Sequence, residues 1–326
     1  MRLHRPARAA AALLGLALLA SCGSVDSPSD GATSTVLAGA SLDVVSATGP
    51  VDLKTAPKVT FGSTPVRTSE VTRKVLTPGT GPVATKSDTV SVRLEIYNGT
   101  TGKLLDDGFA QGRGDEGYRL ARKDLIPGFT EGLIGAQKGG RLAFAIPPAK
   151  GFGTAGNENL KISGTDTIVV IADVADVHAG LTQIDGTQAA SPAGLPTVAF
   201  PDGPIKEPTI TVPKTAAPTT TQVITLIQGT GKTVEKGQTL AAHYAGVLWK
   251  DGSVFDSSYA RGEIADFPIG VGGVIPGWDK SLVGQKVGSR VLLVIPPKDG
   301  YGAAGSPPKI SGTDTLVFVV DVLDAY

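Results

Sequence analysis

Very few residues of this chain could carry metal or covalent chemistry. Its 326 residues include three histidines, His4, His178 and His243, and a single cysteine, Cys22. Zinc sites combine several cysteine, histidine or carboxylate ligands at characteristic spacings, and these residues offer no such set. The run GTGKT at 229–233 lacks the spacing of a phosphate-binding loop, in which four residues separate the first glycine from the Gly-Lys pair. We therefore expect neither a metal nor a cofactor.

The overall composition excludes a further class of function. Lysine and arginine number 30, and aspartate and glutamate also number 30, so no basic field is available to attract nucleic acid. The chain has 43 glycines and 23 prolines but only 5% aromatic residues. This balance indicates many short strands joined by turns, without long helices.

The sequence contains an internal repeat. The phrase KISGTDT occurs at 161–167 and again at 309–315. Further matched stretches are 57–61 with 208–212, 76–90 with 226–240, 125–135 with 274–284, and 146–156 with 295–305. One unit is about 120 residues long, the size of a domain rather than of a solenoid repeat, so two similar domains are expected.

Most runs within a unit are typical of strands. The run 315–323 is rich in β-branched residues, with a glycine-containing turn before it. The stretch PGWDKSLVG is the exception, because Pro276 suits the first turn of a helix and Gly284 suits its end. Trp278 and Leu282 are four residues apart and share one face of that helix. The pattern predicts an α+β fold, with one short helix against an antiparallel sheet in each domain.

The amino terminus resembles a bacterial lipoprotein signal. Three arginines precede an apolar run from Ala9 to Ala20, which is too short to span a membrane. The run ends in the sequence LASC at 19–22, which is similar to a lipobox, so Cys22 is the expected lipid anchor. An ordinary signal peptide with a stray cysteine is the alternative. We expect the mature protein to be attached to the cell membrane on its extracytoplasmic side.

The domain boundaries follow from composition and from the repeat. We predict a signal peptide at 1–21, a flexible tether at 22–56, a first domain at 57–179, a linker at 180–207 and a second domain at 208–326. Whether the linker is flexible or docks as a strand is left open. The stretch PTITV (208–212) could add an edge strand to the second domain.

The second unit resembles the FKBP-type peptidyl-prolyl isomerases. The resemblance rests on HYAGVLWKDGSVFDSSYARG, VIPGW, GYGAAG and TLVFVVDVL, which occur in the family's order between about 226 and 326. It implies a curved antiparallel sheet wrapped around one short helix, with an apolar pocket between them that accepts a proline ring. Because the first unit matches the second by the internal repeat, it is expected to form a domain of the same fold.

The resemblance also implies a set of site residues. Trp278 would form the floor of the pocket, Tyr301 would offer a hydroxyl to a substrate carbonyl, and Asp256 would lie at the edge. The implied catalytic residues are Tyr244, Phe255, Asp256, Trp278, Tyr301 and Phe318. The implied substrate-binding residues are Arg261, Phe267, Val274, Ile275 and Ile310. Without the resemblance, Trp278 and Phe318 would be read as core aromatics and Asp256 with Arg261 as a surface pair.

Three positions of the second unit depart from the family pattern. Ala265 stands where an aromatic residue is usual, Lys309 where an aliphatic residue is usual, and Ser306 where many members have histidine. By analogy all three lie on the rim of the pocket. We expect them to affect substrate preference and macrolide affinity more than catalysis itself.

The first unit keeps the framework and loses most of the pocket. Asp106, Leu125 and Ile126 remain comparable. The replacements are Leu94 for Tyr244, Leu105 for Phe255, Gln111 for Arg261, Phe129 for Trp278, Phe152 for Tyr301, and Val170 for Phe318. We expect Asp106 to have lost its arginine and tyrosine partners, and the first domain to be a weak or inactive isomerase that binds chains or orients the second.

Three functions compete at this point. The first is a lipid-anchored prolyl isomerase that assists the folding of exported proteins, a reaction that breaks no bond and so needs no nucleophile. The second is a non-catalytic chaperone or binding module for unfolded or proline-containing segments. The third is a structural envelope lipoprotein. The expected partners of a monomeric chain are unfolded or proline-containing polypeptides and macrolide inhibitors of the FKBP class.

Overall fold

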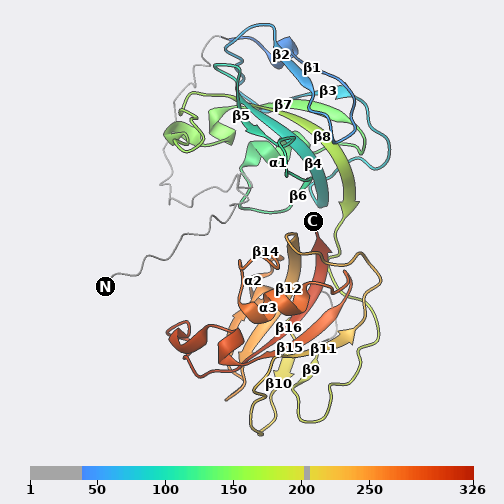
Figure 1. The fold of residues 1–326 in the computed structure, drawn as a ribbon, viewed down its shortest axis with the longest axis vertical. Coiled ribbons are helices and arrows are strands. Elements are labelled where there is room, and N and C mark those ends of the chain that lie inside the picture. The colour runs from blue at the N-terminus through green and yellow to red at the C-terminus, as the bar shows by residue number, and fades with distance from the viewer. Residues whose placement is uncertain (1–38, 202–205) are drawn as a thin grey trace, which may run out of the picture. The chain divides into compact units, whose positions relative to one another are not determined.

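The computed structural model describes residues 39–201 and 206–326, which fall into two compact units divided between His178 and Ala179. Each unit is built on one twisted antiparallel sheet (Figure 1). The predicted signal peptide and Cys22 lie outside the described residues. Within the described ranges, no helix is long and apolar enough to cross a membrane.

The first unit has a six-stranded main sheet in the order β3-β7-β8-β4-β5, with β6 also paired to β4. The strands are β3 (Thr72–Thr77), β4 (Asp88–Asn98), β5 (Lys103–Asp107), β6 (Glu116–Arg119), β7 (Arg141–Ile146) and β8 (Ile168–Ala179). The helix α1 (Pro127–Leu133) and the 3₁₀ turns η2 (Pro148–Lys150) and η3 (Gly153–Ala155) complete this layer.

The second unit repeats the same topology, with its sheet in the order β11-β15-β16-β12-β13 and β14 paired to β12. The strands are β11 (Gln222–Ile227), β12 (Thr239–Leu248), β13 (Val254–Ser257), β14 (Ala265–Pro268), β15 (Arg290–Ile295) and β16 (Leu316–Ala325). The helices are α2 (Ser258–Arg261) and α3 (Pro276–Leu282), with 3₁₀ turns η4 (Pro297–Asp299) and η5 (Gly302–Ala304). The short helix α2 is an addition to the single helix that the sequence predicts.

Helix α3 lies against the sheet as its pattern indicates. Pro276 occupies its first turn, and Trp278 and Leu282 are buried on the side that faces the sheet. Gly277 allows this close approach, since a Cβ at that position would lie 2.7 Å from side-chain atoms of Ile295. Asp279 accepts backbone hydrogen bonds from the preceding loop, at Gly270 and Gly272. The expected α+β architecture is confirmed.

The repeated phrase KISGTDT is a turn that leads into the last strand of each unit. In both copies the aspartate accepts a hydrogen bond from the serine N–H, at 2.8 Å, in the pairs Asp166 with Ser163 and Asp314 with Ser311. The same carboxylates fasten the neighbouring hairpin. Asp166 does so through Asn98 and Thr100, and Asp314 through Lys250. The phrase therefore has the same structural role in both units.

The predicted tether is structured from residue 39 onward. The 3₁₀ turn η1 (Leu42–Val44) leads into β1 (Val45–Thr48), which pairs with β2 (Lys58–Phe61). Leu42 and Val45 pack on the face of the main sheet that carries Ala143, Ala145, Val169 and Ile171. Residues 39–56 therefore belong to the first unit, because that face is apolar and needs a cover.

The predicted linker also belongs to a unit. β9 (Thr197–Ala199) pairs with β10 (Thr209–Thr211), so PTITV forms a separate two-stranded sheet rather than an edge strand of the main sheet. Side chains of this layer, Ile210, Val198 and Phe200 among them, cover the second unit's sheet on the face opposite Tyr244 and Phe318. Residues 181 and 189 donate backbone hydrogen bonds to Leu323 and Leu226. The described part of the linker is a packed layer.

A buried ion pair ties each cover layer to its sheet. Arg141 binds Asp173 through two hydrogen bonds of 2.5 and 2.6 Å and donates to the carbonyls of Gly49 and Pro50. In the second unit, Arg290 binds Asp321 at 2.7 and 2.8 Å. Its guanidinium also lies 3.3 Å from the centre of the Phe200 ring.

Candidate functional site

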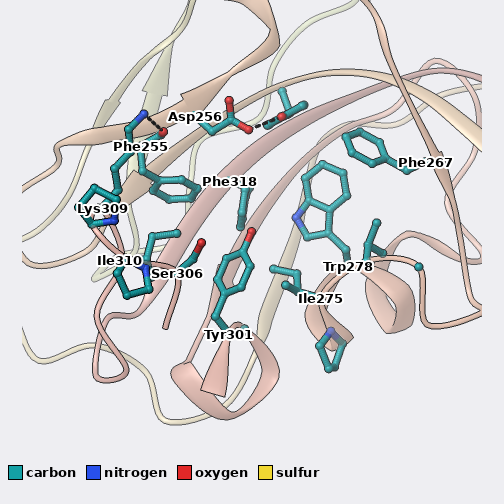
Figure 2. Close-up of a pocket in the computed structure, with 17 residues that line it drawn as sticks. Phe255, Asp256, Phe267, Ile275, Trp278, Tyr301, Ser306, Lys309, Ile310 and Phe318 are labelled. Carbon is teal, nitrogen blue, oxygen red and sulfur yellow. Dashed lines mark hydrogen bonds between the residues drawn. The ribbon is translucent and has the colours of Figure 1, made fainter. Parts of the chain in front are cut away.

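The second unit contains a cavity of about 750 Å³ between helix α3, the concave face of the sheet and the segment 300–310 (Figure 2). Ten of the eleven residues expected at the site line it, and they come from β12, β13, β14, β16, α3 and the loops around them. These ten are Tyr244, Phe255, Asp256, Phe267, Val274, Ile275, Trp278, Tyr301, Ile310 and Phe318. Tertiary folding thus gathers residues separated by up to 74 positions.

The floor of the cavity is an aromatic cluster centred on Trp278. The indole is 3% exposed, and its ring centre lies 5.4 Å from Tyr244, 5.0 Å from Phe267 and 5.2 Å from Phe318, all in edge-to-face contacts. Phe255 packs edge-on against Phe318 at 5.3 Å. Such contacts hold each ring in one orientation, so the cavity keeps its shape without a ligand.

The edge of the cavity has a connected polar group. The Tyr244 hydroxyl donates to Asp256, and Arg261 donates both to Asp256 and, at 2.9 Å, to the Tyr244 oxygen. Arg261 itself does not line the cavity; it stands behind this pair at the end of α2. The guanidinium also lies 5.7 Å from the centre of the Tyr244 ring. Helix α2, which the sequence did not predict, positions this arginine.

Electrostatics fixes the protonation of this group at neutral pH. Burial, reinforced by the hydrogen bond to Asp256, raises the pKa of Tyr244 to about 12. Burial alone would raise the pKa of Asp256, but the hydrogen bonds from Tyr244 and Arg261 outweigh it and hold that pKa below its usual value. Tyr244 is therefore a neutral phenol beside an ionised carboxylate.

Tyr301 stands apart from this group, on the other side of the cavity. It is 43% exposed, and Figure 2 shows its hydroxyl directed into the cavity between Phe318 and Trp278. Partial burial, with a smaller contribution from the charge of Asp256, raises the pKa of Tyr301. It is a neutral hydrogen-bond donor facing the cavity.

The rim of the cavity agrees with the expectation at two of three positions and includes five residues that were not predicted. Ser306 and Lys309 line the cavity, as the analogy implied, whereas Ala265 packs in the core beside it. The missed lining residues are Gly273, Pro276, Gly300, Pro307 and Pro308. Pro276 and Gly300 lie within the motifs VIPGW and GYGAAG, and the other three lie within three positions of them, which was the signal that could have found them.

The corresponding region of the first unit is more closed. Leu125 and Ile126 are 5% and 1% exposed, whereas Val274 and Ile275, their equivalents, are only partly buried. Leu160 packs against the core of the first unit. Phe129 is fully buried, in edge contact with Tyr118 at 4.7 Å and with Phe144 at 5.9 Å.

The expectation that Asp106 lacks an arginine and a tyrosine is wrong in part. Arg113, two residues after Gln111, donates to both oxygens of Asp106 at 3.1 and 3.2 Å and also binds Glu116. Tyr118 donates to Glu116 at 2.6 Å. Arg113 reaches Asp106 from a position two residues further along a glycine-rich loop, which residue-by-residue matching does not find. The phenol of Tyr118, on β6, bonds Glu116 and not Asp106, so the expected loss of the tyrosine partner stands.

The arrangement in the second unit suits binding and distortion rather than bond cleavage. Aromatic rings wall the cavity, neutral phenols donate into it from Tyr244 and Tyr301, and its carboxylate is already bonded to Tyr244 and Arg261. Among the described residues, no cluster of histidine, cysteine, aspartate or glutamate could hold a metal ion. A planar apolar group can enter, and the hydroxyls can donate to a carbonyl at its edge.

Comparisons with known proteins agree with this geometry. The model of the family described as FKBP-type peptidyl-prolyl cis-trans isomerase matches residues 81–171 and 230–323, and so covers more than half of the chain. A peptidyl-prolyl cis-trans isomerase, FKBP15-1 of Arabidopsis thaliana, is 51% identical over 88 residues, which are 27% of this chain and 57% of that protein. The chain thus spans little more than half the length of this plant relative.

Two bacterial proteins match over nearly their whole length. The probable FK506-binding protein of Corynebacterium glutamicum is 39% identical over 121 residues, 37% of this chain and 100% of that protein. The FK506-binding protein of Streptomyces anulatus is 38% identical over 120 residues, 36% of this chain and 97% of that protein. With the family matched in both units, the chain belongs to the FKBP-type peptidyl-prolyl cis-trans isomerases.

Proposed function

We propose that this protein catalyses cis-trans isomerisation of X–Pro peptide bonds in the cavity of its second unit. The observation that carries the proposal is the preformed aromatic cavity over Trp278, with a neutral hydroxyl on either side, from Tyr244 and Tyr301. Its floor and walls offer a largely apolar surface that a proline ring can contact.

The reaction requires only that a twisted amide be held better than a planar one. Rotation about the X–Pro bond meets a barrier of about 18–20 kcal/mol, because amide resonance is lost on the way. A planar amide is more dipolar than a twisted one, so an apolar cavity stabilises the twisted form relative to water. A thousandfold acceleration requires roughly 4 kcal/mol of such preference, which a shaped cavity can supply without covalent chemistry.

The assignment of catalysis to the second unit rests on the difference between the two pockets. Val274 and Ile275 leave apolar surface open to the cavity, while their equivalents Leu125 and Ile126 are covered. Leu160 occupies the place in the first unit that Pro308 has on the rim of the second. We infer that the first unit is an inactive or weakly active companion of the same fold.

The matched residues Tyr301 and Phe152 allow a direct test in the full chain. Exchange of a short X–Pro peptide between its cis and trans forms is followed by NMR. We expect the unmodified protein to accelerate exchange, Tyr301→Ala to lower the acceleration about tenfold, corresponding to roughly 1.4 kcal/mol, and Phe152→Ala to leave it unchanged.

Each alternative has its own result in this experiment. If Phe152→Ala lowers the rate as much as Tyr301→Ala, catalysis is not confined to the second unit. If the peptide binds, with shifts of its proline signals, but exchanges no faster, the protein is a binding module and the catalytic proposal fails.

We further propose that the mature chain acts on exported polypeptides from a lipid anchor at Cys22. The support is the signal-like sequence of residues 1–22, with its arginines, short apolar run and terminal LASC. A single acyl chain binds a membrane weakly, so several chains on this residue would be needed for firm attachment. Labelled fatty acid should enter the protein, and Cys22→Ser should abolish both the label and its sedimentation with membranes; labelling that survives the substitution would contradict the proposal.

A further inference from the structure

Lys309 is the one lining residue of the cavity with an uncompensated charge. Of the 17 residues that line it, only Asp256 and Lys309 are charged at neutral pH. The charge of Asp256 is balanced by its ion pair with Arg261. No carboxylate in the described part of the chain forms an ion pair with Lys309, so the rim of the cavity has a net positive charge.

The ammonium group is held in a defined place. Its Nζ donates to the backbone carbonyl of Phe255 at 2.7 Å (Figure 2). Phe255 is the extra residue of a β-bulge, since Asp256 pairs with Gly246 and Val254 with Val247, which leaves it without a partner on β12. Bulges are common next to functional sites, where they redirect a side chain or a backbone group. Here the bulge directs a carbonyl toward the rim.

The backbone that carries Lys309 is equally well fixed. Ser306 and Ile310 exchange two backbone hydrogen bonds, of 2.8 and 3.0 Å, which close the tight loop between them. Ile310 is 6% exposed and packs in the core, while Lys309 beside it is exposed. An ammonium has three donors, so two N–H groups remain for a ligand after the bond to Phe255.

We propose that Lys309 makes the enzyme prefer substrates with an acidic side chain directly beside the proline. This inference rests on the proposed function. A proline ring seated over Trp278 brings the adjoining residues to the rim, where Lys309 and Phe255 form one wall. A carboxylate there meets an unpaired ammonium that is already positioned, so little side-chain entropy is lost on binding. A lysine or arginine at the same place in the substrate is repelled.

The test compares peptides that differ only in charge. End-blocked tetrapeptides with glutamate or glutamine immediately before proline, and a second pair with the same residues immediately after it, are followed by NMR exchange with the full chain. We expect the glutamate peptide of at least one pair to have a kcat/KM about three to five times that of its glutamine partner, as is usual for a partly exposed ion pair. The ratio of the two kcat/KM values should fall toward one at about 0.5 M salt, because the Debye length there is only several ångströms and the attraction between the two charges is screened.

Variants assign the preference to this residue. Lys309→Met should bring the ratio to about one, and Lys309→Glu should bring it below one. Lys298→Met is the matched control, because Lys298 is also exposed and lies in η4, just before the segment 300–310, but does not line the cavity. The ratio of this variant should match that of the unmodified protein. A ratio near one in the unmodified protein for both pairs, or a preference that Lys309→Met retains, overturns the inference.

The same samples separate this inference from the proposed function. Turnover of the glutamine peptides tests isomerase activity without the charge. If no peptide is turned over, dissociation constants from the proline signals still give the glutamate-to-glutamine ratio. A charge preference in binding that disappears in Lys309→Met then supports the role of Lys309 while the catalytic proposal fails, and no preference in binding overturns both.

Discussion

Asp256 is the residue whose substitution tests the polar edge of the cavity most directly. Its two oxygens accept from Tyr244 and Arg261, and an asparagine of the same shape can accept at only one of them. The substitution Asp256→Asn therefore removes one charge-assisted hydrogen bond and the negative charge, while the volume is retained.

The structure sets the size of the expected effects. The side chains of Asp256 and Arg261 are 42% and 47% exposed, so water replaces much of the lost interaction and the free energy of unfolding should fall by only about 1 kcal/mol. The pKa of Tyr244 should change more clearly. Burial, the largest cause of the raised pKa, remains in the variant. The hydrogen bond and the charge of Asp256, which also raise the pKa, are lost, while Arg261 still lowers it. The pKa of Tyr244 should therefore drop from about 12 toward 10.

The assay is an NMR titration of tyrosine ring carbons, with the Tyr244 signal assigned from Tyr244→Phe. Urea unfolding and peptide exchange are measured on the same samples, and we expect exchange to slow by no more than about tenfold. Asp299→Asn is the control, since Asp299 also accepts a hydrogen bond and pairs with a lysine but lies outside the cavity. A Tyr244 pKa that stays near 12 in Asp256→Asn would show that the carboxylate does not govern this phenol, and the description of the edge would be wrong.

Three further outcomes follow from the charges of the two units. Because the pKa of Asp256 is held below its usual value and that of Tyr244 is about 12, kcat/KM should be flat from about pH 6 to 9, and a step in that range would point to another titrating group. Burial raises the pKa of Glu95 above 4.5, so the folded state holds this proton more tightly and the free energy of unfolding should decrease as the pH rises from about 4.5 through the folded-state pKa. Glu95→Gln should remove that decrease in urea unfolding measured across pH, and an unchanged slope would contradict it. Asp321→Ala leaves Arg290 buried without its partner and should cost about 3–5 kcal/mol in urea unfolding, whereas a loss below about 1 kcal/mol would mean that water reaches the guanidinium.

The site residues were predicted from the order of the motifs along the chain as much as from the residue types. Trp278 and Tyr301 were placed from motifs that keep the same order and spacing as in a known family, and the structure brings both to one cavity. Arg261 was correctly expected beside Asp256, but the helix α2 that places it there was not expected. Four residues form too short a segment to show helical periodicity.

The misplaced features share one cause, which is pairing between distant parts of the chain. PTITV alternates as a strand should, but alternation does not say which partner the strand takes. The main sheet has an apolar face on the side away from the cavity, and β9 with β10 covers it. The replacement of Gln111 by Arg113 as the partner of Asp106 is similar, since a flexible loop can reach one carboxylate from several positions.

The sequence by itself determined the duplicated α+β architecture, the family, and 12 of the 17 residues that line the cavity, because these depend on local patterns and on the order of motifs. The tertiary structure alone decided which pocket is open, how the cover layers pack, and which backbone carbonyl holds the ammonium group of Lys309. Each of these depends on side chains far apart in the sequence that compete for the same space or the same partner. Such competition is settled by packing and by the need to pair buried polar groups, and it leaves no periodic signal in the chain.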